Sequence, residues 1–397
     1  MIYLDNAATT QVKQEVVNEM LPYFTEHFGN PESVHAAGFA PLEAIRKAEK
    51  QVHEFIHSNG KGKIVFTSGG TESNNMVFNL CGPRRLFAMN IITSATEHKS
   101  VLEPAKSHAG TVVRLILPGR KGFVSIDDLS PNDIPAFSLI SLMHMNNETG
   151  MINDVYRIGE MLKEFSDMDV FYHVDCVLSA GELPICVNDM NVDMVSISSH
   201  KIHGPKGVGC LWLSDRVLNR IEEGNSLALI RGGGQQSGLR AGTMDVPSIV
   251  GFGKACELAA NVDDTRQKIE SLTNTFMDYL KKLCSDQKIK MKLNFARSQS
   301  HDDKILSIRF PGADAETVVM VASRNGLCIS NGAACNSFSS EPSYVLTNSK
   351  IRPDDARNTV RVSFSVMNTQ DEMENAATIL TDAVKEVLSL NLTDAVI

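Results

Sequence analysis

Apolar runs of strand length alternate with helical periodicity between about residues 60 and 215. The runs are continuous rather than alternating, which is typical of strands that helices cover on both faces. Residues 155–165 carry apolar side chains at helical spacing between two such runs. The pattern predicts an α/β fold with a mostly parallel central sheet flanked by helices. The predicted strands are 63–67, 86–93, 112–117, 137–145, 170–174, 194–198 and 208–213.

The flanking segments predict more helices and a second, smaller unit. Residues 41–56 form an amphipathic pattern that begins with Pro41, and a long helical stretch runs from Pro247 to about residue 284, broken near 261–264. Beyond it, a strand at 304–310 and helices at 315–323 and 370–388 indicate a smaller α+β unit. We predict a large domain at 15–259 and a small domain formed by 1–14 and 260–397. A fixed cleft between two domains is a common place for a small-molecule site.

Composition excludes several classes of protein. The 397 residues include 38 Lys and Arg against 47 Asp and Glu, a net charge of −9, which argues against direct binding of nucleic acid through phosphate neutralisation. No run of about 18 apolar residues and no signal peptide is visible, so we expect a cytoplasmic protein without a membrane segment. The eight cysteines are scattered without metal-ligand spacing, so we expect no metal site.

Three short segments carry candidate chemistry, and the first surrounds Lys201. The sequence S-S-H-K-I-H-G-P-K-G at 198–207 follows a predicted buried strand. Desolvation lowers the pKa of a lysine, and an amine that titrates near neutrality can form a Schiff base with a carbonyl. Taken alone, Lys201 could equally be a solvated loop lysine.

The second and third segments favour a cofactor with a ring nitrogen and a phosphate. Asp175 ends a predicted strand, where it could pair with a protonated pyridine nitrogen or simply cap the next helix. Gly70 and Thr71 lie in a strand–glycine–helix segment, which can bind a phosphate at the helix N-terminus. Neither a dinucleotide fingerprint nor a P-loop occurs in the chain. Together the three segments predict a site for pyridoxal 5′-phosphate.

The chain also resembles the NifS/IscS-type cysteine desulfurases, which are class V aminotransferase relatives with the pyridoxal-phosphate fold type I. The resemblance covers essentially the whole chain. The motifs that carry it are Y-L-D-N-A-A-T-T at 3–10, G-N-P at 29–31, T-S-G-G-T-E-S-N-N at 67–75, T-E-H-K at 96–99, N-N-E-T-G at 146–150, H-V-D at 173–175, the segment at 198–207, G-G-G-Q at 232–235, G-L-R-A-G-T at 238–243, N-G-A-A-C at 331–335 and E-P-S-Y-V-L at 341–346.

The resemblance implies a role for each matching residue. Lys201 would hold the cofactor covalently, Asp175 would pair with its ring nitrogen, and His98 would stack on the ring and move protons. Several residues would hold the cofactor's phosphate together. One of them, Thr243, would reach the phosphate from a second subunit, which implies a homodimer. The remaining roles fall on Gly70, Thr71, Ser198 and His200 for the phosphate, Asn147 near the phenolic oxygen, and Asn30 and Arg361 for the substrate carboxylate.

Cys335 lies in a loop of small and polar residues at about 330–345, which we expect to be mobile. A thiolate there could attack the sulfur of a cofactor-bound cysteine and carry it as a persulfide to a protein acceptor. The resemblance thus implies conversion of L-cysteine to L-alanine, with sulfur delivered to iron–sulfur cluster assembly, tRNA thiolation or DNA phosphorothioation.

The chain departs from the family pattern in ways that leave the reactive residues in place. Leu178 stands where relatives usually carry a glutamine that donates to the cofactor's phenolic oxygen, and Met367 stands where many carry an arginine. We interpret the chain as a diverged but active enzyme. The alternatives are a selenocysteine lyase, another class V enzyme, and a non-catalytic docking module of a sulfur-transfer complex.

Overall fold

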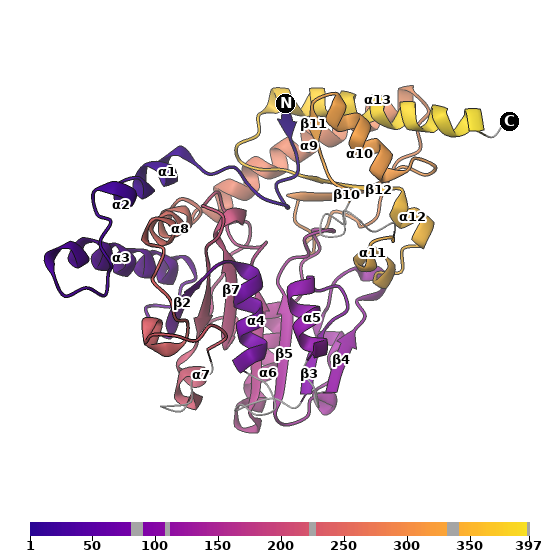
Figure 1. Ribbon diagram of the computed structural model, residues 1–397. Helices are drawn as coiled ribbons and strands as arrows, with labels where there is room; N and C mark the ends of the chain where they lie inside the picture. The colour runs from indigo at the N-terminus through magenta and orange to yellow at the C-terminus, as the bar shows by residue number, and fades with distance from the viewer. Residues whose placement is uncertain (81–89, 108–111, 222–227, 332–340, 395–397) are drawn as a thin grey trace.

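The computed structural model describes residues 1–80, 90–107, 112–221, 228–331 and 341–394, and its centre is a seven-stranded sheet (Figure 1). The strand order is β2-β8-β7-β6-β5-β3-β4, and β8 is antiparallel to both of its neighbours while the other pairs are parallel. Every residue of β5, β6, β7 and β8 is buried, so the prediction of a mostly parallel sheet covered on both faces is confirmed. The strands are β2 (Lys63–Thr67), β3 (Asn90–Ser94), β4 (Val112–Ile116), β5 (Ser138–Met143), β6 (Val170–Asp175), β7 (Met194–Ser198) and β8 (Gly209–Leu213).

Helices cover the two faces of this sheet. Alternate residues of β6 show the division: Tyr172 packs in the core with α3, α6 and α8, whereas Phe171 packs in the core with α4 and α5. Asp175 lies an even number of residues from Phe171 and therefore points to the face of α4 and α5. No helix in the described ranges is long and apolar enough to cross a bilayer. These helices are α3 (Phe39–Phe55), α4 (Gly70–Leu80), α5 (Lys99–Ser107), α6 (Val155–Leu162), α7 (Asp215–Arg220) and α8 (Val246–Leu258).

The C-terminal part of the chain builds a second core on a three-stranded antiparallel sheet of order β12-β10-β9. Leu4 from the N-terminal segment packs in this core, next to the short parallel pair of β1 and β11. The predicted strand at 304–310 and helices at 315–323 and 370–388 are confirmed, and the long helical stretch breaks at residues 259–261 into α8 and α9. The domain boundaries at 15–259 stay a prediction. The elements are β1 (Ile2–Tyr3), β9 (Lys292–Leu293), β10 (Ile305–Arg309), β11 (Leu327–Cys328), β12 (Thr359–Ser363), α1 (Gln14–Met20), α2 (Pro22–Thr25), α9 (Val262–Asp286), α10 (Ala315–Arg324), α11 (Tyr344–Asn348), α12 (Pro353–Arg357) and α13 (Gln370–Asp394).

A buried ion pair joins segments that are far apart in the sequence. Lys304 is 1% exposed and its Nζ lies 2.6 Å from Oε1 of Glu182, which is also buried. Oε2 of Glu182 has no hydrogen-bond partner among the described residues. The Glu182 carboxylate therefore depends on Lys304 for its compensating charge, in an environment where an isolated charge is costly, and the buried carboxyl group of Asp302 interacts with both.

Removing one member of this pair is expected to destabilise the protein strongly. We predict that Lys304→Met lowers the free energy of unfolding by about 3–5 kcal/mol, because it leaves the Glu182 carboxylate buried without its cation. The double variant Lys304→Met/Glu182→Leu should recover most of this loss. Urea unfolding of the wild type, of Lys304→Met and of the double variant measures both effects. A single variant within about 1 kcal/mol of wild type would contradict the prediction.

Candidate active site

A cavity of about 430 Å³ lies at the carboxyl ends of the parallel strands. Its lining residues follow β2, β3, β5, β6 and β7, which is the edge where open α/β sheets bind their ligands. Nine of the predicted site residues line it. They are Gly70, Thr71, His98, Asn147, Asp175, Ser198, His200, Lys201 and Arg361.

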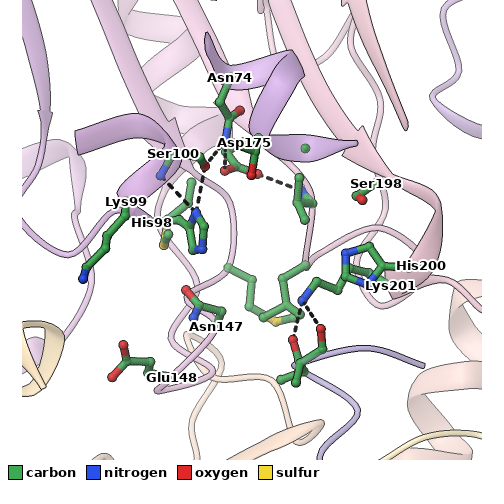
Figure 2. A pocket seen from close by; sticks show the side chains of 18 of the residues that line it. Asn74, His98, Lys99, Ser100, Asn147, Glu148, Asp175, Ser198, His200 and Lys201 are labelled. Atoms are coloured by element: carbon green, nitrogen blue, oxygen red, sulfur yellow. Dashed lines mark hydrogen bonds between the residues drawn. The ribbon is translucent and has the colours of Figure 1, made fainter. Parts of the chain in front are cut away.

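Asp175 is the buried carboxylate of this cavity (Figure 2). It ends β6, and its Oδ1 accepts a hydrogen bond from the backbone N–H of Val177 at 2.9 Å. Its Oδ2 accepts from Nδ2 of Asn74 on α4 at 2.7 Å. Burial raises the pKa of Asp175, while these hydrogen bonds and the charges of His98 and Lys201 lower it. A cationic ring nitrogen placed here would compensate the cost of burying the charge.

A glycine cradle lies in the same cavity as Asp175, at the N-terminus of α4. The helix begins at Gly70, and a Cβ added there would lie 2.5 Å from Cγ2 of Val177, so a larger residue would require the Val177 side chain to shift. Thr71 and Ser198 bring hydroxyls to the same cavity, and the helix N-terminus adds unpaired backbone N–H groups. Burial, with the charge of Lys201, lowers the pKa of His200 to about 4, so its imidazole is neutral near pH 7. The cradle therefore offers hydrogen-bond donors to an anion.

Lys201 lies in the turn after β7 and points into the cavity. Its Nζ donates to the backbone carbonyl of Ala7 at 2.5 Å and to that of Ala8 at 2.9 Å (Figure 2). The N-terminal segment thus forms one wall of the site. An amine held by peptide carbonyls within the same cavity as Asp175 can reach a carbonyl compound bound between them.

Arg361 on β12 brings a guanidinium to the opposite side of the cavity. Its Nη2 lies 2.7 Å from Oδ1 of Asp5, and its Nη1 donates to the backbone carbonyl of Asn147 at 2.9 Å. Nε of Arg361 is buried and has no hydrogen-bond partner among the described residues. A fixed guanidinium with a donor still available suits a carboxylate ligand.

The comparisons with known proteins agree with this geometry. The model of the class-V aminotransferase family matches residues 2–375. The chain belongs to this family, in its cysteine desulfurase branch. It is 33% identical to the cysteine desulfurase IscS of Clostridium botulinum (strain Kyoto / Type A2) over 97% of this chain and 94% of that protein. The resemblance stated from the motifs is therefore confirmed.

Solved structures of the family confirm the fold as well. A NifS-like protein superimposes with a TM-score of 0.84 at 29% identity, covering 97% of this chain and 99% of that one. A structure of SspA in complex with cysteine superimposes with a TM-score of 0.75 at 31% identity, covering 93% and 100% of the two chains. The class-V aminotransferase family depends on pyridoxal phosphate, and its desulfurase members are enzymes.

Two of the residues that the family resemblance assigned to the site do not line the cavity of the single chain, and a third lies outside the described residues. Asn30 and Thr243 are both exposed and line no part of it. Gln235 connects the segment that contains Asn30 with the segment that contains Thr243. Its Nε2 donates to Oε2 of Glu32, and its Oε1 accepts from the backbone N–H of Gly242. Cys335 lies outside the described residues. The roles of these three residues stay predictions.

The structure adds cavity residues that the sequence did not single out. Asn74 and Ser100 connect Asp175 with His98, and Glu148 adds a second carboxyl group. Leu178 is 4% exposed and packs with apolar side chains, including Met145, so the wall at this position is apolar. The clue for Ser100 was its place two residues after His98, where a hydroxyl can bond back to the histidine.

Glu148 makes the stability of the fold depend on pH. Burial raises its pKa to about 7, although a hydrogen bond from Ser343 and the charges of Arg361 and His98 lower it. The folded protein then binds this proton more tightly than the unfolded chain, so the free energy of unfolding falls as pH rises from about 4.5 to about 7. Between pH 5 and pH 8, the free energy of unfolding of Glu148→Gln should decrease by about 3 kcal/mol less than that of the wild type, as measured by urea unfolding at the two pH values. Glu43→Gln, an exposed control, should keep the wild-type pH dependence, and an unchanged dependence in Glu148→Gln would contradict the assignment.

Proposed function

We propose that the chain binds pyridoxal 5′-phosphate in this cavity, with Lys201 as its covalent attachment and Asp175 as the partner of its ring nitrogen. The glycine cradle at Gly70, together with Thr71, Ser198 and His200, would hold the phosphate. Two observations support this fit: the close approach at Gly70, and the buried carboxylate that lacks a cationic partner within hydrogen-bond distance among the described residues. When bound, the cofactor supplies an electron sink for bonds at the substrate's Cα.

The reaction that this site supports best is the desulfuration of L-cysteine to L-alanine. Lys201, Asp175 and His98 in one cavity carry the proposal, because proton movement next to an electron sink requires these groups together. Arg361, with Asn30, would orient the substrate carboxylate. SspA, a relative of 31% identity, was solved with cysteine bound, which supports the choice of substrate.

Cys335 would take the sulfur in the second half of the reaction. Its thiolate forms a bond to the substrate sulfur while the substrate's carbon–sulfur bond breaks, and the electron pair stays on carbon, which is protonated to give alanine. Cysteine and the enzyme thiol are consumed, and alanine and an enzyme persulfide are formed, so no external oxidant or reductant is required. The persulfide is then delivered to a protein acceptor.

We further propose that the active form is a homodimer in the cytoplasm. Five large apolar side chains around α1, α2 and the start of α3 are exposed in the single chain, more than a solvent-facing segment usually carries. Asn30 lies among them in the sequence. A second copy covering this surface would bring its Thr243 and nearby residues to the cavity. The exposed apolar residues are Leu21, Phe24, Phe28, Val34 and Phe39.

The test of the function is an assay of the purified protein with L-cysteine. The expected results are a yellow chromophore that borohydride bleaches, and alanine released in equal amount to the sulfur transferred. A colourless protein that is insensitive to borohydride and forms no alanine would favour the non-catalytic docking module. Alanine formation with no sulfur on Cys335 would reject the persulfide step alone.

The acceptor and pathway need a separate experiment. Iron–sulfur assembly, tRNA thiolation and DNA phosphorothioation all use similar donors, and the net charge of −9 supports delivery to a protein rather than to nucleic acid directly. Loading the enzyme with ³⁵S from labelled cysteine and following the label to candidate acceptor proteins decides between the three.

A further inference from the structure

A continuous chain of hydrogen bonds links Asp175 to His98 through two residues outside the predicted site (Figure 2). Nδ2 of Asn74 lies 2.7 Å from Oδ2 of Asp175 and 2.9 Å from Oγ of Ser100. Oγ of Ser100 lies 2.7 Å from Nδ1 of His98. The backbone N–H of Ser100 also donates to Nδ1 of His98 at 3.1 Å. Asn74 and Ser100 are both buried, so these contacts are shielded from bulk solvent.

The direction of each bond follows from the carboxylate at one end. An ionised Asp175 can only accept, so Asn74 presents its N–H groups, one to Asp175 and one to Ser100. Oδ1 of Asn74 has no hydrogen-bond partner within the described segments, as expected if the amide is oriented by its donors. The backbone N–H of Ser100 donates to Nδ1 of His98, which requires a lone pair on that nitrogen. The hydroxyl of Ser100, which accepts from Asn74, therefore donates its own proton to Nδ1.

Nδ1 of His98 therefore receives two donors, a backbone N–H and a hydroxyl, from the same residue. A proton on Nδ1 would face both, so the neutral ring must carry its proton on Nε2, the nitrogen on the side away from Ser100. To remove a proton from a ligand in the cavity, His98 would need a lone pair on Nε2. A protonated Nε2 has no lone pair to accept that proton.

We propose that Asn74 and Ser100 are positioning residues that hold His98 as a neutral hydrogen-bond donor, so that Lys201, not His98, is the base that removes protons in this site. This inference rests on the proposed function and assigns proton removal to one of the two cavity residues that could act as a base, Lys201 and His98. The charged groups around His98 are Asp175 and Glu148, which favour a protonated ring, and Lys99 and Lys201, which oppose one. The two donors from Ser100 favour the neutral ring.

The direct test is ¹⁵N NMR of the purified, cofactor-loaded protein labelled at histidine, with the His98 signals assigned by their loss in His98→Gln. The expected result at pH 7–8 is an unprotonated Nδ1 and a protonated Nε2. A protonated Nδ1, or shifts averaged between the two tautomers, would overturn the proposal. The measurement does not depend on desulfurase activity: the expected tautomer in a protein that forms no alanine supports this inference and rejects the proposed reaction.

Variants separate positioning from general packing. Ser100→Ala removes the hydroxyl donor, so the His98 shifts should move toward averaging and alanine formation should fall roughly 2- to 10-fold, as expected for one hydrogen bond. Ser100→Thr keeps the hydroxyl and should restore both. Ser141→Ala is the matched control, because Ser141 is a buried serine that bonds a different histidine, His173, at 2.9 Å. His98 shifts that stay unchanged in Ser100→Ala, or that move equally in Ser141→Ala, would contradict the proposal.

Discussion

Lys201→Ala is expected to lower kcat for alanine formation at least about 1,000-fold. The variant loses the only group that the proposed mechanism uses both to attach the cofactor and to move the Cα proton. A neighbouring residue cannot substitute, because His98 is held with its lone pair toward Ser100 and not toward the cavity. The experiment compares alanine formation and cofactor absorbance in wild type and variant.

A nearby lysine provides the control for this prediction. Lys206 lies five residues after Lys201 in the same motif and is exposed, so Lys206→Ala should keep activity within about twofold of wild type. Lys201→Ala should still bind the cofactor reversibly at the α4 cradle, but borohydride should no longer fix it to the protein. Substantial alanine formation by Lys201→Ala would reject the role of this amine.

The central sheet could be predicted because burial on both faces leaves a direct trace in the sequence. β5, β6 and β7 are buried along their whole length, and each appears as a mostly apolar run in which the few polar residues do not alternate regularly with apolar ones. The same strand pattern also predicted the position of the site, because Asp175 ends β6 and Lys201 lies three residues after the end of β7. Parallel neighbours end at one edge of a sheet, so two reactive residues 26 positions apart in the sequence meet in one cavity.

Other features depend on contacts that no local pattern reveals. Strand β8 is as apolar as β7 but runs antiparallel to it, and its direction is set by the chain's path between them. Asn74 follows the predicted phosphate segment, yet its bond to Asp175 joins residues 101 positions apart. Glu148 titrates near neutrality because of burial, which its sequence neighbours do not indicate. Tertiary packing, not propensity, determines these three features.

Cys335→Ser is expected to reduce alanine formation from L-cysteine at least about 100-fold while cofactor absorbance stays at the wild-type level. A serine hydroxyl is a far weaker nucleophile than a thiolate toward sulfur, and it cannot hold the transferred atom as a persulfide. Without an acceptor for the sulfur, the carbon–sulfur bond has no productive way to break. The measurements are alanine by chromatography and protein-bound ³⁵S after incubation with labelled cysteine.

The other cysteines in the described part of the chain should not rescue this variant. Burial raises the pKa of the thiols of Cys176, Cys210 and Cys256, which keeps them in the unreactive protonated form. Cys328 on β11 is partly exposed but pairs with Tyr3 of β1 in a separate two-stranded sheet, so Cys328→Ser should retain activity and serves as the matched control. Undiminished turnover of L-cysteine by Cys335→Ser would remove the persulfide step. It would point instead to direct transfer of the sulfur to an external thiol, which then carries the persulfide, because the cavity residues that act on Cα are unchanged in that variant.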